Sequence, residues 1–266
     1  MSTLLEKVLL EAKSANRAAL IGYLPAGFPT VAGCKAAIDV LIDAGFDAVE
    51  IGYPYSDPVM DGPIIQSAAD IALSNGLKAK DVIETLNHAT SRGIAAVVMT
   101  YWNPIEQFGA DKFASAIASA GGSGVITPDL SFDQAQPWKR SADSAGINTI
   151  FVVAPSTTDD RLKKVTSISS GFVYAASLMG VTGTRTAISN SAKELVSRVR
   201  KVTHLPVAVG LGVSTPEQAR EVAQYADGVI IGSALIKLLL DTDLATGLTA
   251  LSELAKSLVS ATRGAR

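Results

Sequence analysis

Apolar and polar stretches alternate along the chain in a regular order. Short, nearly continuous apolar runs are typical of parallel strands that are covered on both faces. The chain has eight such runs, at 18–24, 48–51, 94–100, 124–127, 147–153, 171–176, 205–209 and 228–231. A segment with helical spacing of its apolar residues follows each of them. Alternating strands and helices predict parallel pairing through crossover helices.

The helical segments carry recognisable stripes and caps. We expect them at 31–44, 64–75, 79–91, 111–120, 132–145, 158–168, 191–202 and 215–225. The segment 31–44 has an apolar stripe made of Cys34, Ala37, Ile38, Leu41 and Ile42. The last segment begins with Thr215 as N-cap, Pro216 at the first helical position and Gln218 completing a capping box.

The two ends of the chain add helices outside this repeat. Leu5, Val8, Leu9 and Ala12 fall at helical spacing, so the first residues read as an amphipathic helix and not as a signal peptide. The tail 233–262 holds a short helix and a longer one. The first strand runs into YLPAGFPT and lacks the G-x-G-x-x-G turn of a doubly wound sheet. We therefore predict an α/β fold, a single (β/α)8 TIM-barrel domain over residues 1–266, with an extra N-terminal helix and a short extra helix after the eighth strand.

Composition narrows the class of protein. Hydrophobic residues make up 48% and charged residues 18% of the 266 residues, as in a globular protein. A net charge of -2 without a block of like charge argues against a nucleic-acid partner. The single cysteine, Cys34, fits a reducing cytoplasm. The two histidines are far apart in sequence, which argues against a histidine-based metal site. No apolar run approaches the ~18 residues of a membrane span.

Carboxylates lie where a barrel places its chemistry, at the carboxyl ends of the strands. Glu50 interrupts the second strand near its end, and Asp57 and Asp61 follow on a long loop rich in Pro and Gly. Glu50 is either a buried structural group paired with a lysine or a capping amide, or a proton donor whose pKa an apolar barrel mouth raises. Asp61 precedes Gly62, as turn-forming Asp residues do, and Asp57-Pro58 is the stronger turn signal.

Glycines at three neighbouring strand ends indicate a phosphate site. Gly210 and Gly212 follow the seventh strand, and Gly232 and Ser233 follow the eighth and open the short helix. Glycines let backbone N–H groups approach an anion, and a helix start presents unpaired N–H donors. The loop after the sixth strand adds Gly180, Gly183 and then Arg185, which can clamp phosphate, anchor a lid or be solvated. The aromatic residues at strand ends either pack the barrel or line a flat apolar pocket; they are Tyr23, Tyr101, Trp102 and Tyr174.

Six segments in order carry a resemblance to a known family: VEIGYPYSDPVMDGPIIQ, YWNP, PDL, MGVTG, GLGVS and GSALI. Over essentially the whole chain they resemble the α subunit of tryptophan synthase. The resemblance implies a lyase that cleaves indole-3-glycerol phosphate to indole and glyceraldehyde 3-phosphate in L-tryptophan biosynthesis. It also implies a β-subunit partner, in a heterotetramer of two α and two β chains. Pyridoxal phosphate is expected only in that partner, with no cofactor or metal in this chain.

The resemblance also implies roles for single residues. Glu50 matches the family's acid/base and Asp61 its second carboxylate. Tyr23 and Tyr174 match indole-pocket positions, with Tyr101 and Leu211 nearby. Gly183, Gly212, Gly232 and Ser233 match the phosphate loops. Thr182 matches the lid threonine that contacts the Asp61 loop, and Arg185 is assigned to the lid. The chain departs from the common pattern at positions away from the carboxylates, namely Phe28, Ser131, Leu178 and Met179.

Two other readings remain open on the residues alone. Other phosphate-binding barrels of aromatic amino-acid pathways use a Lys/Glu or Cys/Asp pair, whereas no strand-end lysine is evident here and Cys34 lies within a predicted helix. A non-catalytic barrel that only activates a partner is the second reading, and the presence of both Glu50 and Asp61 argues against it.

Overall fold

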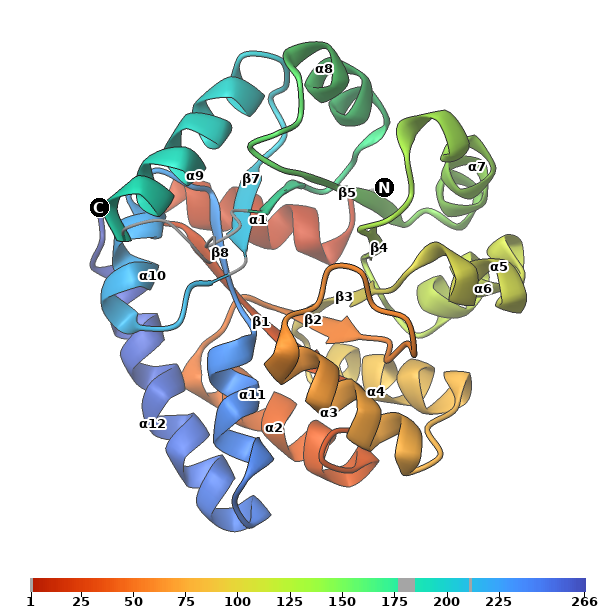
Figure 1. Ribbon diagram of the computed structural model, residues 1–266, viewed down its shortest axis with the longest axis vertical. Coiled ribbons are helices and arrows are strands. Elements are labelled where there is room, and N and C mark those ends of the chain that lie inside the picture. The colour runs from red at the N-terminus through yellow and green to blue at the C-terminus, as the bar shows by residue number, and fades with distance from the viewer. Residues whose placement is uncertain (1, 177–184, 211) are drawn as a thin grey trace.

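The computed structural model describes residues 2–176, 185–210 and 212–266, and within them eight strands close into a barrel (Figure 1). All strands are parallel and pair in chain order, and β8 closes on β1 with Ala19 opposite Gly228. The strands are β1 (Ala19–Pro25), β2 (Ala48–Gly52), β3 (Ala95–Met99), β4 (Gly124–Thr127), β5 (Asn148–Val153), β6 (Val173–Ala176), β7 (Val207–Gly210) and β8 (Gly228–Ile231). The predicted fold class is confirmed.

Helices surround this barrel (Figure 1). They are α1 (Leu4–Ser14), α2 (Val31–Ala44), α3 (Pro63–Ser74), α4 (Ala79–Ser91), α5 (Trp102–Phe108), α6 (Ala110–Ser119), α7 (Gln136–Ala145), α8 (Asp159–Ile168), α9 (Arg185–Arg200), α10 (Pro216–Ala223), α11 (Ser233–Leu240) and α12 (Leu244–Arg263), with a 3-10 turn at Phe132–Gln134. The capping box predicted for α10 is present, and α11 is the extra helix after β8. None of the helices in the described ranges has the length and apolar character needed to cross a membrane.

Three helices differ from the sequence prediction, and each difference has a physical reason. Helix α5 was not predicted, because its start depends on a distant residue: Asp129 accepts the Trp102 backbone N–H at 3.0 Å. The predicted helix 132–145 is divided, because Pro137 has no N–H and its ring clashes with a preceding turn. Helix α9 begins at Arg185, earlier than the predicted 191, since the polar residues before 191 gave no apolar stripe.

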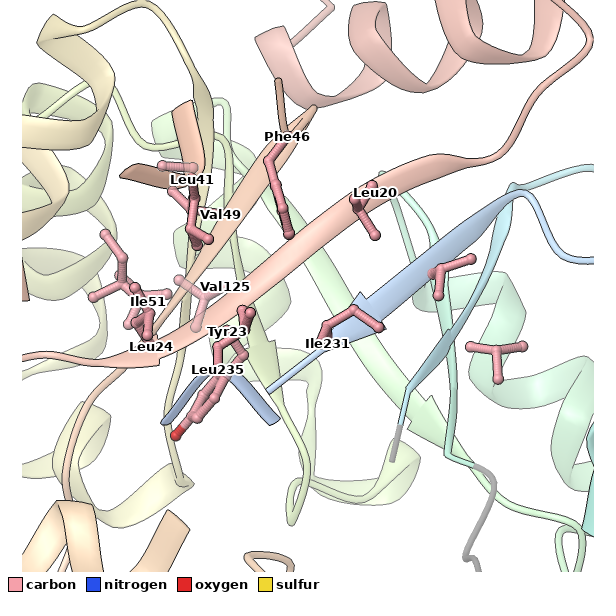
Figure 2. Packing of buried hydrophobic residues seen from close by; sticks show 14 of the residues in the cluster. Leu20, Tyr23, Leu24, Leu41, Phe46, Val49, Ile51, Val125, Ile231 and Leu235 are labelled. Atoms are coloured by element: carbon pink, nitrogen blue, oxygen red, sulfur yellow. The ribbon is translucent and has the colours of Figure 1, made fainter. Parts of the chain in front are cut away.

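Alternation along the strands separates two apolar layers. On β1 and β2 the outward side chains Leu20, Val49 and Ile51 pack against the surrounding helices. Figure 2 shows part of this layer, with Leu41 of α2 and Phe46 of the following turn beside β1. A Cβ at Gly22 would collide with Leu41, so glycine lets this helix approach the strand closely. Strong outward packing on one face fixes which residues of β2 point inward.

The inward layer fills the barrel. Helix α1 closes the barrel at the end where the strands begin, here called the lower end; the upper end is where the strands finish. Leu5, Leu9 and Ala12 of α1 join the inward side chains of the strands in one buried cluster. The predicted stripe of the N-terminal helix is thus buried at these positions, and Val8 is partly buried. Because this end is filled with apolar side chains, space for a ligand is left at the other end, where the strands finish.

Candidate active site

Glu50 lies on β2 and points into the barrel, because the residues on either side of it face outward. Its register partners are Tyr23 on β1 and Val97 on β3. The side chain is only 1% exposed, and neither carboxylate oxygen has a hydrogen-bond partner among the described residues. Burial and the nearby Asp61 raise its pKa to about 8. A structural glutamate would have a lysine or an amide beside it, and the described residues provide neither.

Asp61 reaches the same space from the loop between β2 and α3. Burial raises its pKa, and a hydrogen bond from Tyr101 acts in the opposite direction. Its charge contributes to the raised pKa of Glu50, so the two carboxylates interact electrostatically. Paired acids in different environments are the usual basis of general acid/base chemistry, in which one is protonated and the other ionised.

A cavity of about 590 Å³, its open mouth included, brings both acids together. The lining residues are Tyr23, Glu50, Met60, Asp61, Ile65, Met99, Pro128, Val152, Tyr174, Ala176, Gly212, Val213, Ile230, Gly232 and Ser233. Most of the wall is apolar, so the two carboxylates have little competition for protons or hydrogen bonds from the wall itself.

The two lining tyrosines are each seated on a glycine at the end of a strand. A Cβ on Gly52 would collide with the ring and hydroxyl of Tyr23, and one on Gly210 would collide with those of Tyr174. Both tyrosines are buried and lie near the acids, and burial, followed by the charges of Asp61 and Glu50, raises their pKa values well above the ordinary value. They therefore stay neutral, and they present fixed aromatic surfaces to the cavity.

The predicted phosphate loops meet at the mouth of the same cavity. Gly212 has φ +85°, a conformation that L side chains rarely adopt, and it lines the cavity. Gly232 is the N-cap of α11 and makes no side-chain cap hydrogen bond, and Ser233 is the first helical residue. The start of α11 thus presents backbone N–H groups beside the cavity, which is suited to an anion.

Several predicted residues are not part of this description. Thr182, Gly183 and Leu211 lie outside the described residues, as do Gly180, Leu178 and Met179. Arg185 is placed as the first residue of α9, and its side chain is not described. The remaining predictions are placed elsewhere: Tyr101 is not among the lining residues, and the exposed Asp57 carboxylate accepts a hydrogen bond from Ser56 at 2.6 Å. Phe28 is fully buried, and Ser131 precedes the 3-10 turn.

Sequence reasoning missed the apolar part of the wall. These residues are Met60, Ile65, Met99, Pro128, Val152, Ala176, Val213 and Ile230. A signal was available for some of them, since Val152, Ala176 and Ile230 are inward-facing positions close to the ends of their strands. Among the side chains that the structure describes, no group of three or more His, Cys, Asp and Glu residues is arranged to hold a metal ion.

Known protein families and proteins resemble this chain over nearly its whole length. The family model described as "Tryptophan synthase alpha chain" matches residues 9–263. The tryptophan synthase alpha chain of Thermobifida fusca is 51% identical over 267 residues, which are 99% of this chain and 99% of that protein. That of Streptomyces avermitilis is 53% identical over 263 residues, 98% of this chain and 95% of the relative.

Solved structures agree with these relatives. A chain in a structure of tryptophan synthase from Mycobacterium tuberculosis superposes with a TM-score of 0.92 at 47% identity, covering 99% of each chain. An aminoacrylate-bound form of the enzyme from the same organism gives a TM-score of 0.89 at 44% identity, covering 98% of this chain and 100% of the other. The similarity therefore covers the barrel, the cavity and the extra helices together.

Proposed function

This chain belongs to the tryptophan synthase alpha chain family, and we propose that Glu50 and Asp61 carry out the acid–base chemistry of its reaction. The reaction is a retro-aldol cleavage of indole-3-glycerol phosphate to indole and glyceraldehyde 3-phosphate, a lyase step of L-tryptophan biosynthesis. It breaks the bond between C3 of the indole ring and the glycerol carbon. Indole becomes an adequate leaving group only after C3 is protonated, so the site must hold a proton donor in a dry environment.

The observation that carries this proposal is the isolation of the Glu50 carboxylate. Both of its oxygens are buried without a partner among the described residues, they face the cavity, and the pKa is about 8. A carboxylic acid that stays protonated at neutral pH can deliver its proton to C3 and form the indolenine. The resulting carboxylate then accepts the proton of the glycerol hydroxyl as the carbon–carbon bond breaks and the aldehyde forms.

Asp61 is assigned to the ring nitrogen. Positive charge develops at this nitrogen once C3 is protonated, and an ionised carboxylate that accepts the N–H hydrogen bond stabilises that charge. Asp61 lines the same cavity as Tyr23 and Tyr174, whose flat rings suit an indole ring. Leu211 is proposed as a further pocket residue, and Thr182 and Arg185 as lid residues, on the resemblance alone.

The mouth of the cavity is proposed to hold the substrate phosphate. Gly212, Gly232 and Ser233 bring backbone N–H groups to one place, and Gly183 is proposed to complete the site from the loop after β6. Binding the remote phosphate fixes the reacting carbon relative to Glu50, so that binding energy contributes to orientation.

The partner of this chain is the β subunit of tryptophan synthase. We expect two α and two β chains in the assembly, and a cytoplasmic location. The acid–base groups of the cavity suffice for the reaction, so we expect no cofactor in this chain, with pyridoxal phosphate confined to the β subunit.

Indole release from indole-3-glycerol phosphate tests the proposal, measured with the isolated chain and again with a β subunit added. Slow release that rises strongly with the partner is the expected result. If neither condition yields indole, the cavity takes a different phosphorylated substrate, and the roles given to Glu50 and Asp61 are wrong.

A further inference from the structure

Tyr101 lies next to the cavity without lining it. It follows β3, its side chain is 4% exposed, and its hydroxyl points to the loop that carries Asp61. The hydroxyl oxygen accepts the backbone N–H of Met60 at 3.1 Å. A buried tyrosine hydroxyl placed on a loop in this way fixes the loop, because an unpaired backbone N–H at this site would cost free energy.

The same hydroxyl lies close to the carboxylate of the next residue, Asp61. A hydrogen bond between the two lowers the pKa of Asp61 and raises that of Tyr101. One oxygen atom therefore accepts from Met60 and donates to Asp61, two consecutive residues. Such a bridge restrains both the position of the loop backbone and the direction of the carboxylate.

Further contacts hold the stretch around Tyr101. The ring of Tyr101 packs on Tyr55, with centroids 5.5 Å apart, and the Tyr55 hydroxyl accepts a hydrogen bond from Asn103 at 3.1 Å. The next residue, Trp102, donates its backbone N–H to both carboxylate oxygens of Asp129 at 3.0 Å. The hydroxyl is thus presented by a stretch that contacts the Asp61 loop through Tyr55 and the loop after β4 through Asp129.

We propose that Tyr101 is a positioning residue for Asp61, and that its hydroxyl holds the Asp61 carboxylate in the orientation that receives the ring N–H of the substrate. The role given to Tyr101 rests on the proposed function of Asp61. It differs from a place in the indole pocket, because the ring of Tyr101 packs on Tyr55 and the hydroxyl acts on the loop.

Burial and nearby charges keep the Tyr101 hydroxyl protonated, so that it can donate. Burial is the largest cause of its raised pKa, the charges of Asp61 and Asp129 raise that pKa further, and the Met60 hydrogen bond opposes them. Glu50, Tyr23 and Tyr174 are the other titratable groups facing Asp61. The hydroxyl of Tyr101 is therefore protonated throughout the pH range in which the enzyme works.

The experiment compares Tyr101→Phe with wild type in the cleavage reaction, with the β subunit present. The variant keeps the ring and its packing and loses only the hydroxyl. We expect kcat to fall about tenfold, the effect of one hydrogen bond to a charged group, with KM within about twofold because the phosphate contacts are untouched. The acidic limb of the kcat/KM profile should move to higher pH, since a hydrogen bond that lowers the pKa of Asp61 is lost.

Two controls separate this role from simple support of the loop. Tyr225→Phe removes a buried hydroxyl that has no partner among the described residues and lies at the other end of the barrel, so its kinetics should match wild type. Tyr55→Phe loosens the same loop by losing the Asn103 contact, without touching Asp61. If Tyr55→Phe and Tyr101→Phe lower kcat equally and neither moves the acidic limb, Tyr101 is only a loop anchor.

Asp61→Asn shows which proposal fails. Loss of turnover in Asp61→Asn together with wild-type kinetics in Tyr101→Phe overturns the positioning role alone. Wild-type turnover in Asp61→Asn overturns the proposed function of Asp61 itself. Titration of a 13C-labelled Asp61 carboxyl by NMR gives a readout that needs no turnover: its pKa should be higher in Tyr101→Phe than in wild type, and an equal pKa contradicts the bridge.

Discussion

Glu6 and Glu50 lie near opposite ends of the same barrel, and their surroundings are opposite as well. Glu6, in the first turn of α1, accepts hydrogen bonds from the Thr3 backbone at 2.9 Å, from Ser2 and from Asn148. Burial alone would raise its pKa, but these donors outweigh burial and lower it. Glu50 has the burial without the donors, so its pKa rises to about 8.

The two ends of the barrel thus hold carboxylates of different kinds, one that stabilises the fold and one that is available to a ligand. At the lower end, Thr3, Glu6 and Asn148 form a closed network in which Thr3 also donates to Asn148 at 2.7 Å and caps α1. At the upper end, the site of Glu50 remains without protein partners among the described residues, which is the condition of a group that is to exchange a proton with a ligand. Removing either carboxylate should therefore have effects of different kinds.

The largest effect is expected from Glu50→Gln. Turnover should fall by about 10³-fold, because the amide cannot donate and then accept the proton. Affinity for glyceraldehyde 3-phosphate should change little. Glu6→Gln is the matched change at the other end, and it should keep wild-type turnover. A steady-state indole assay checks both variants, and comparable activity in the two would remove the contrast.

The contributions of Glu50 and Glu6 to the free energy of unfolding should depend on pH in opposite directions. The unfolded chain has Glu50 near its ordinary pKa of 4.5 and the folded chain near 8, so the unfolded state binds fewer protons between these values. The contribution of Glu50 to stability is then lost as pH rises through this window, on the order of 5 kcal/mol in total. Glu6 has a lowered pKa, so its contribution is present above 4.5 and is lost as pH falls.

Urea unfolding of wild type and Glu50→Gln between pH 5 and pH 9 isolates the contribution of Glu50 to the free energy of unfolding. The free energy of unfolding of the wild type should fall relative to the variant as pH rises. Parallel curves for the two proteins would show that Glu50 does not titrate in this range, and would remove the basis for its role as an acid at neutral pH.

Asn148→Ala tests the lower end. The side chain is 4% exposed and bonds both Thr3 and Glu6, so its loss should destabilise the protein by about 2 kcal/mol. Turnover of the folded variant should equal that of wild type. The exposed Asn87 on α4 offers a control, since Asn87→Ala should change the stability by less than about 0.5 kcal/mol. Equal destabilisation by the two changes would contradict the network.

Gly212→Asp probes the upper end with a charge and should have the smallest effect. A carboxylate at the proposed phosphate site should raise KM about tenfold by repulsion, with a smaller change in kcat. Gly76→Asp is the control, because Gly76 also has positive φ, at +80°, but is exposed and has open space around its Cβ position. If both variants raise KM alike, the effect comes from backbone strain and not from charge at the phosphate site.

The barrel and the upper carboxylates were predictable because local patterns determine them. An acid at an inward position near the end of an apolar strand must point into the barrel. Because the barrel is closed, the ends of the other strands surround that acid. Gly232 and Ser233 were predictable for the same reason, as the start of a helix directly after a strand.

The partners of these residues were not predictable, because they come from contacts between loops that are far apart in sequence. The bridge from Tyr101 to Met60 joins loops after two different strands, and Asp129 caps α5 from a third. Each contact depends on the closed geometry of the barrel, and no spacing within a single segment encodes it. The capping box of Thr3 and Glu6 lies within one short segment, whereas its link to Asn148 joins residues far apart in the chain.

The apolar closure of the lower end by α1 has a consequence for traffic through the molecule. Leu5, Leu9 and Ala12 stop the barrel from below, so the cavity is a blind well with its opening on the side of the loops. Among the described residues, this leaves the loop end of the barrel as the route for substrate and products. A partner bound over that end would receive the uncharged aromatic product without its passing through bulk water. The phosphorylated product could leave only when that end of the barrel is open to solvent.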